Sequence, residues 1–324
     1  MKSFVFFILL LGGLFVGGTR LKAYFQAFIQ EGTNRYISQK DGQQNPIQKR
    51  NEQEDEPTED EQKKNAGKDT KTGNERVKNT QDANAQTIKK GTDKYEFTYI
   101  FRDLTDKGVQ FQWTGDKKIY DKLPRQFGLP KDFFKGNYTQ AQVDEFQRKG
   151  SFRQAVLEGK PFTIPDYRKI AKDNKPVTLP LYKLLCKYIG NNATPTKLIE
   201  ALMVFCQDIP YKRPPASRGN RYIGELDVPA KMLTVGTGDC DTKSVLFASV
   251  LLHQPSIKVA VVLVDNPGHM FAAIRGVPTA YQAHITHQGE KYIICEPVGN
   301  ARLPIGQLGF KDCRTRLVVK ISPK

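Results

Sequence analysis

The hydrophobic and polar positions divide the chain into three regions of different character. Residues 3–18 form an almost uninterrupted apolar run, SFVFFILLLGGLFVGG. Residues 38–93 contain no aromatic side chain and very few aliphatic ones. From residue 94 onward, apolar and polar residues alternate with the spacings of strands and helices. We therefore expect a leader, a linker and a globular region of about 230 residues.

The leader, assigned to residues 1–25, has an apolar run of about 16 residues. This length lies between that of the apolar core of a signal peptide and that of a membrane-spanning helix. Gly17 and Gly18 precede Thr19 and resemble a small-residue cleavage site. The apolar and aromatic residues after Arg20 would instead prolong a membrane anchor. The sequence thus predicts export, with the protein either anchored by its N-terminus or secreted or periplasmic after cleavage.

The linker, assigned to residues 38–93, cannot bury enough apolar surface to offset the entropy lost on ordering. It is predicted to be a disordered polar tether. The globular region after it is expected to have a hairpin and helical part, residues 94–204, and a second part, residues 205–324.

In the first part, Tyr95, Phe97, Tyr99 and Phe101 alternate with other side chains before a DLTDKG turn. Period-two alternation around a turn predicts a β-hairpin with one buried face. Residues 130–205 show mostly helical spacing of apolar residues. Thr194 followed by a proline there is typical of a helix N-cap.

The most informative segment of the second part begins at Gly236, where a glycine-rich turn leads through Asp239 to Cys240. The residues from Thr242 have helical apolar spacing, so Cys240 is expected at a helix N-terminus. Unpaired backbone N–H groups and the positive end of the helix dipole favour thiolate there, as a nucleophilic cysteine requires.

Two predicted strands follow that helix and carry the other chemical groups. Residues 257–264 form a β-branched run, a DNPG turn follows, and His269 begins the next strand. A later strand, KYIIC, ends at Glu296. A carboxylate beside a histidine would orient the imidazole and stabilise its cation. Cys240, His269 and Glu296 are therefore the candidate catalytic residues.

Charge and cysteine content narrow the function classes. Of the net charge of +16, about +14 belongs to residues 94–324. This surplus indicates either an anionic partner, such as an envelope polymer or a membrane surface, or a solvated lysine-rich surface. No nucleic-acid motif is present, and no nucleic-acid partner is expected. The composition excludes a polytopic membrane protein, and five cysteines are too few for a disulfide framework.

The segments GTGDCDTKSVLFASVLL, PGHMFAAI and KYIICEPVG resemble the transglutaminase-like, papain-like cysteine superfamily, in particular its microbial exported or membrane-tethered members. The resemblance covers residues 205–308 well and the predicted hairpin loosely. It implies an α+β fold: a papain-like transglutaminase core, with a cysteine at a helix N-terminus packed on an antiparallel sheet carrying His and Glu, preceded by a β-hairpin and a helical region.

By this resemblance Cys240 corresponds to the nucleophile, His269 to the general acid and base, and Glu296 to the orienting carboxylate. The chain departs from the superfamily in having Glu where Asp is most frequent. It also has Met270 and Phe271 after the histidine, where many relatives have a small residue and Trp.

The implied activity is cysteine acyl transfer on a protein or peptide amide, with water or an amine as acceptor. The backbone N–H of Cys240 is the first candidate oxyanion donor, and Gln207, Tyr211 and Asp239 are further substrate or oxyanion candidates. No cofactor or metal is expected. The alternative is a catalytically inactive module for binding or assembly at the cell envelope.

Three weaker patterns remain. His284 and His287 form an HxxH pair that we assign to a solvated turn flank rather than a metal site. Cys186 and Cys206 lie among apolar residues and are expected to be inert core thiols. For Cys295 and Cys313, a disulfide and a simple core position are both left open.

Overall fold

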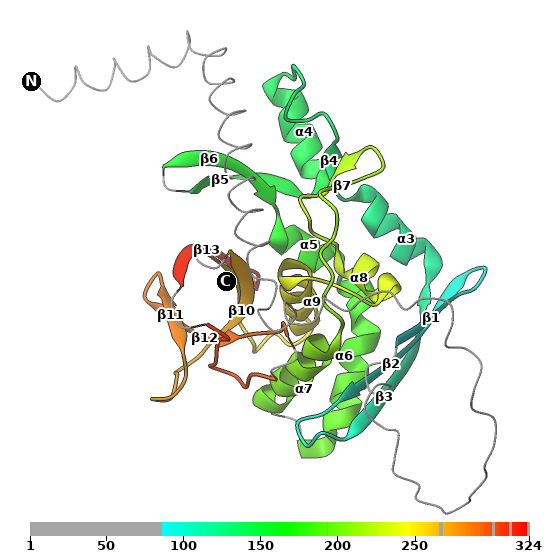
Figure 1. The fold of residues 1–324 in the computed structure, drawn as a ribbon, viewed down its shortest axis with the longest axis vertical. Helices are drawn as coiled ribbons and strands as arrows, with labels where there is room; N and C mark the ends of the chain where they lie inside the picture. The colour runs from blue at the N-terminus through cyan, green and yellow to red at the C-terminus, as the bar shows by residue number, and fades with distance from the viewer. Residues whose placement is uncertain are drawn as a thin grey trace, which may run out of the picture.

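The computed structural model describes residues 86–157, 159–192, 194–265, 268–299, 302–310 and 313–322. The predicted leader and most of the predicted linker lie outside these residues. Helices and antiparallel sheets both contribute extensively, and the fold class is α+β (Figure 1). In chain order the elements are β1 (Gln86–Lys90), β2 (Lys94–Arg102), β3 (Gly108–Asp116), α3 (Lys117–Gln126), β4 (Leu129–Pro130), α4 (Gln140–Gly150), β5 (Phe152–Leu157), β6 (Lys160–Pro165), α5 (Tyr167–Asp173), α6 (Lys175–Ile189), η2 (Gly190–Asn192), α7 (Pro195–Asp208), β7 (Ser217–Arg218), β8 (Arg221–Tyr222), α8 (Pro229–Val235), α9 (Cys240–Leu251), β9 (Val259–Asp265), β10 (His269–Arg275), β11 (His284–His287), β12 (Glu290–Cys295) and β13 (Arg314–Lys320).

The predicted aromatic hairpin is confirmed as β2 and β3, which pair in antiparallel register from Lys94 opposite Asp116 to Arg102 opposite Gly108. The alternating aromatic residues of β2 are buried on one face. A third strand, β1, pairs with the other edge of β2. The predicted linker therefore extended too far, because its last residues, although polar, hydrogen-bond to an exposed strand edge instead of needing a core of their own.

Helices α6, α7 and α9 lie between the sheet of β1, β2 and β3 and the five-stranded sheet (Figure 1). Helix α7 begins as predicted, with the Thr194 side chain accepting a hydrogen bond from the Lys197 N–H. Helix α9 is buried along almost its whole length and contacts α5, α6, α7, α8 and the strands β9 and β10. From Val245 onward the helix is apolar except for Ser249, as expected at such a central position, whereas its first turn carries polar residues.

The five-stranded sheet has the order β11-β12-β10-β9-β13, with every pair antiparallel. Its central strand β10 begins at His269, and Ala272 lies opposite Cys295 of β12. One face of the sheet packs on the helices, as Met270 does. The other face packs against Phe310 and its neighbours. Both predicted strands around His269 and the strand before Glu296 are confirmed.

The prediction of a mostly helical stretch over residues 130–205 was wrong for residues 152–165. These form a hairpin, β5 and β6, in which Phe152 lies opposite Pro165. Gly159 in the connection has φ = 76°, a conformation that glycine adopts without strain. The hairpin alternates buried and exposed residues over only a few positions, which is too short a pattern to override the helical spacing around it.

The hydrophobic core is continuous across the boundary drawn at residues 204 and 205. Helix α7 spans this boundary. One cluster of buried side chains runs from Tyr95 in β2 to Ile321 after β13. The hairpin, the helices and the five-stranded sheet therefore share one core.

None of the helices in the described ranges has both the length and the apolar character needed to cross a membrane.

Candidate functional site

Cys240 is the first residue of α9, where the sequence predicted it. Gly236 ends α8 with φ = 71°, which reverses the chain so that α9 can start four residues later. Asp239 is the N-cap: its side chain accepts a hydrogen bond from the Thr242 N–H at 3.1 Å. The Cys240 side chain is 1% exposed.

Helix α9 is joined to β10 near its N-terminus. The Ser244 hydroxyl donates a hydrogen bond to the Met270 carbonyl at 3.2 Å. Ser244 lies one helical turn after Cys240, and Met270 follows His269. The N-terminal turn of α9 therefore faces the start of β10, which places the thiol and the imidazole in the same part of the molecule.

His269 and Glu296 form a hydrogen-bonded pair. The Nε2 atom of His269 lies 2.7 Å from Oε2 of Glu296, whose side chain is buried. The second oxygen of Glu296 accepts from the Val298 N–H at 3.2 Å. The imidazole packs edge-on against Phe310, with 5.4 Å between ring centroids. Both oxygens of the carboxylate are thus engaged, and the imidazole plane is restrained.

The pair also determines which ring nitrogen is basic. A carboxylate oxygen accepts hydrogen bonds, so Nε2 of His269 carries the proton in this contact. In the neutral ring, Nδ1 then holds the lone pair and is the atom that could take a proton from a thiol.

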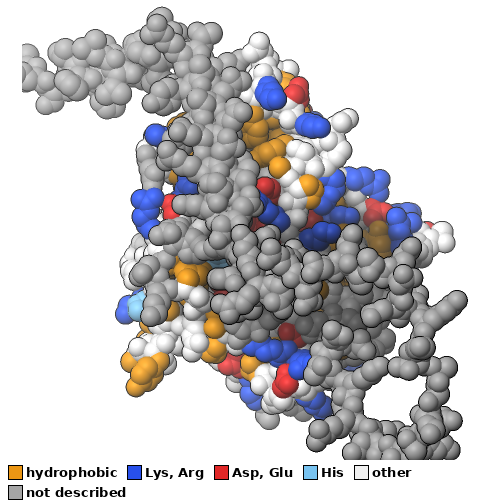
Figure 2. All heavy atoms as spheres, in the orientation of Figure 1, with side chains coloured by type: hydrophobic (Ala, Val, Ile, Leu, Met, Phe, Trp, Pro, Cys, Tyr) orange, Lys and Arg blue, Asp and Glu red, His pale blue; other side chains and the backbone are white. Residues whose placement is uncertain are grey.

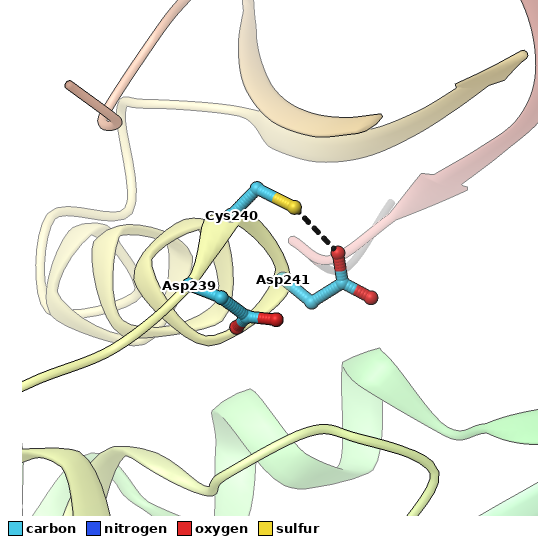
Figure 3. A group of neighbouring side chains, drawn as sticks. All are labelled: Asp239, Cys240 and Asp241. Atoms are coloured by element: carbon cyan, nitrogen blue, oxygen red, sulfur yellow. Dashed lines mark hydrogen bonds between the residues drawn. The ribbon is translucent and has the colours of Figure 1, made fainter. Parts of the chain in front are cut away.

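The thiol itself contacts the next residue. Cys240 Sγ donates to Oδ1 of Asp241 at 3.1 Å, and ligand atoms of Asp239, Cys240 and Asp241 all lie within 4.8 Å of one another (Figure 3). Residues of these types could hold a metal ion. However, the Asp239 carboxylate caps α9, and the Asp241 carboxylate accepts from the thiol. These contacts account for the cluster without an ion.

The Gln207 amide is engaged by backbone carbonyls in this structure. Its amide Nε2 donates to the Glu296 carbonyl at 2.8 Å and to the Leu303 carbonyl at 3.0 Å. An amide nitrogen has two protons, so neither remains for a substrate. The side chain is also fully buried. Gln207 instead joins the end of β12, next to the catalytic candidate Glu296, to the loop at Leu303.

The Asp239 carboxylate is buried and serves as the helix cap, accepting a hydrogen bond rather than donating one. Tyr211 remains a candidate substrate or oxyanion residue. It forms an isolated parallel bridge with Gly238, two residues before Cys240, and its side chain is 54% exposed. Desolvation and the charges of Cys240, Asp239 and Asp241 raise the pKa of its hydroxyl, which therefore stays a proton donor.

Sequence reasoning missed Tyr167, the first residue of α5. Its ring is buried, and α5 packs on α9. Burial, followed by the charges of Asp241, Cys240 and Asp239, raises its pKa well above the ordinary value. No local pattern identifies this residue, because it lies 73 positions before Cys240 and is brought there by helix packing alone.

Lys243 was also missed. It is 1% exposed, and its ammonium donates to the Ile209 carbonyl. Burial lowers its pKa to about 8, against the opposing effect of Cys206, Asp208, Glu296 and Asp239. The Lys243 ammonium therefore lies near three carboxylates: Asp208 at the end of α7, Glu296 after β12 and Asp239 before α9.

The weaker sequence patterns resolve differently. His284 and His287 belong to strand β11, which ends directly before the turn at residues 288–289. Three residues apart on a strand, they point to opposite faces and cannot share a ligand. All five cysteines are free of disulfide bonds. Cys206 and Cys295 are fully buried, and burial raises the pKa of Cys206 to about 12. Cys186 and Cys313 are only partly buried.

Comparisons of the chain with protein-family models, with curated proteins and with solved structures yield no match.

Proposed function

We propose that the protein is a cysteine acyl-transfer enzyme with a papain-like transglutaminase core, acting on a protein or peptide amide through Cys240, His269 and Glu296. The observation that carries the proposal is the partly buried hydrogen bond of 2.7 Å between His269 and Glu296. His269 begins β10 and Glu296 follows the neighbouring strand β12, so the proposed base and its orienting acid come from adjacent strands.

The proposed reaction requires the Cys240 thiol and the His269 imidazole to come into contact. Nδ1 of His269 takes the proton of the Cys240 thiol, and the thiolate attacks the amide carbonyl carbon. The resulting oxyanion is stabilised by the Cys240 backbone N–H, with the Tyr211 hydroxyl as the second donor. The imidazolium returns its proton to the leaving amine, and a thioester remains on Cys240. Water or a second amine then attacks the thioester and restores the thiol.

A second candidate is an inactive module for binding or assembly at the cell envelope. Two observations favour it. The Cys240 thiol donates to Asp241, and a carboxylate beside a thiol opposes its ionisation. His269 also packs against Phe310, which belongs to the cluster on the sheet face opposite the one that Met270 presents to α9. Catalysis would then require the imidazole or the thiol to adopt another rotamer.

The setting of either function is the cell envelope, with the protein exported and either tethered or released. A protein or peptide is the proposed substrate, and an anionic envelope polymer or membrane surface is a proposed partner. The excess of basic residues supports the latter. Figure 2 shows Lys and Arg side chains gathered around α3, whose sequence contains three lysines and one arginine.

The test is the reactivity of each cysteine with iodoacetamide, measured by mass spectrometry from about pH 5 to about pH 9. The full chain and its His269→Ala variant would be compared. Cys186 and Cys313 are partly buried references, and Cys206 and Cys295 are buried ones.

Fast labelling of Cys240 near pH 6 that disappears in His269→Ala would support a thiolate–imidazolium pair. A burst of p-nitrophenolate from p-nitrophenyl acetate, with acetyl bound to Cys240, would then demonstrate acyl transfer. Labelling that rises only near the ordinary thiol pKa of about 8.5, equally in both proteins, would refute the enzyme and favour the binding module.

A further inference from the structure

Glu296 lies just beyond the part of the sheet that is held by paired strands. The pairing of β10 with β12 ends at Ala272 opposite Cys295. Glu296 is the next residue, and its carboxylate reaches Nε2 of His269 at 2.7 Å. Ladder hydrogen bonds fix the backbone only as far as the last pair. The position of the carboxylate therefore depends on contacts that hold the Glu296 backbone beyond the ladder.

The Gln207 side chain supplies such a contact. Its Nε2 atom donates to the Glu296 carbonyl at 2.8 Å and to the Leu303 carbonyl at 3.0 Å, and the side chain is fully buried. An amide NH₂ group is planar and has two protons in a fixed arrangement, so both carbonyls are held relative to one nitrogen. One side chain thus fixes the backbone of Glu296 to a residue seven positions further along the chain.

The end of α7, from which Gln207 acts, is itself held in place. The next residue, Asp208, is buried and accepts from the Arg302 guanidinium at 2.7 and 2.8 Å. The carbonyl of Ile209, the C-cap of α7, accepts from the Lys243 ammonium of α9. The end of α7 therefore joins the cysteine helix to the segment that follows β12 and carries the carboxylate.

The backbone beside Leu303 is held in an unfavourable conformation. Arg302 has φ = 49°, in the left-handed region that residues with a side chain seldom adopt. Its guanidinium also donates to the Arg102 carbonyl at 2.9 Å and to the Asp103 carbonyl at 2.8 Å. Strain of this kind persists only where surrounding contacts over-determine it, and it is concentrated in functional sites. Its presence next to a carbonyl that the amide holds indicates that this segment is placed for a site.

We propose that Gln207 is a positioning residue for the pair of His269 and Glu296: by holding the Glu296 carbonyl, it sets the place from which the carboxylate meets the imidazole. The inference rests on the proposed acyl transfer, in which this pair is the base and its orienting acid. The amide is neutral and donates to two carbonyls, so it acts through position and adds no charge to the pair. A misplacement of about 1 Å in such a group can cost about 100-fold in rate.

The test replaces Gln207 by Met in the full chain, because Met has a similar length and no donor. Ring ¹⁵N NMR measures the tautomer of neutral His269, and mass spectrometry measures the alkylation rate of Cys240 near pH 6. We expect part of the His269 population to leave the Nε2–H form, in the direction of Glu296→Ala, and the alkylation rate to fall about tenfold. Ring shifts identical to those of wild type would overturn the proposal.

The matched control is Gln147→Met. Gln147 is also a buried glutamine, and its amide donates to the Thr163 hydroxyl at 3.1 Å. It belongs to α4, which packs on β4 and β5. The control should lower stability without changing either measurement. If Gln147→Met alters the His269 ring shifts as much as Gln207→Met does, the effect is a general loosening of the fold and the proposal fails.

A double-mutant cycle shows whether Gln207 acts through Glu296. In the Glu296→Ala background, Gln207→Met should change the alkylation rate of Cys240 by less than about twofold, because the group that it positions is gone. The same tenfold loss in both backgrounds would show that the amide affects the thiol by another route, which also overturns the proposal.

Failure of the proposed function would look different. It appears in the wild type, as labelling of Cys240 near pH 6 that His269→Ala leaves unchanged. The ring shifts of His269 do not depend on reactivity of the thiol, so in that case they still show whether Gln207 positions the pair.

Two measurements keep the test decisive if Gln207→Met does not fold. Gln207→Asn keeps an amide, but it is one methylene shorter and cannot hold both carbonyls, so it should change the His269 ring shifts in the same direction. In the wild type, the side-chain amide protons of Gln207 should exchange with solvent more slowly than those of Gln147, because both are bonded. Exchange that is no slower would overturn the proposal.

Discussion

The carboxylate of Glu296 reaches His269 along a diagonal of the sheet. Ala272 lies opposite Cys295, so continuing this antiparallel register places Glu296 opposite Phe271, two residues after His269. Diagonal neighbours have Cα atoms about 7–8 Å apart, which long side chains can bridge. The extra methylene of Glu relative to Asp suits this geometry, and the 2.7 Å contact is its result.

Replacing Glu296 by Gln tests this contact. The amide keeps the size of the side chain but removes the negative charge that stabilises the imidazolium, so Cys240 alkylation near pH 6 should fall about 10- to 100-fold. Mass spectrometry of the labelled cysteine measures the change. Glu290→Gln, at the start of the strand that leads to Glu296 but paired with Arg275 and Lys320, is the control and should leave the rate unchanged. Equal rates in wild type and Glu296→Gln would remove Glu296 from the site.

Asp241→Asn should have the opposite effect. The Asp241 carboxylate accepts from the Cys240 thiol at 3.1 Å, and its negative charge disfavours the thiolate. We expect alkylation of Cys240 to become several-fold faster at acidic pH. The pH at half-maximal rate should move downward in the same measurement. An unchanged profile would show that the Asp241 contact does not govern thiol ionisation.

Lys243 predicts a specific pH dependence of stability. Burial lowers its pKa to about 8 in the folded protein from the ordinary 10.5. Between these values the unfolded chain binds more protons, so this lysine makes the free energy of unfolding increase as pH rises from about 8 to about 10.5. The full effect is on the order of 3 kcal/mol.

Urea unfolding near pH 7.5 and pH 10 would compare wild type with Lys243→Met. The free energy of unfolding of wild type, relative to that of Lys243→Met, should be larger at pH 10 than at pH 7.5. A matched substitution, Lys122→Met on the surface, corrects for general alkaline effects. A pH-independent difference would show that Lys243 titrates normally.

Phe205 in α7 should be essential for stability. Its ring contacts Tyr99, Phe101 and Phe111 of the hairpin, and it is 1% exposed. Phe205→Ala should lower the free energy of unfolding by about 3–5 kcal/mol. Val156→Ala, at an exposed position of β5, is the control. Because hairpin and sheet share one core, thermal unfolding of residues 94–322 is expected as a single transition; two separate transitions would contradict a shared core.

The sequence by itself determined the local elements that carry the candidate chemistry. Glycine and aspartate before Cys240 specify a capped helix start. The β-branched run of residues 257–264 with the turn after it, and the apolar segment before Glu296, predict the strands on either side. Each of these signals depends on residues that are close together in the sequence. In the structure, Cys240 begins α9, His269 begins β10 and Glu296 follows β12.

Only the tertiary structure decided what surrounds those positions. The two protons of the Gln207 amide are used by carbonyls near residues 296 and 303, and Tyr167 and Lys243 are buried around the cysteine helix. Periodicity tells which side of an element is buried, but not which distant segment packs against it. Partners, desolvation and pKa values depend on that packing, and they follow only once the chain has folded.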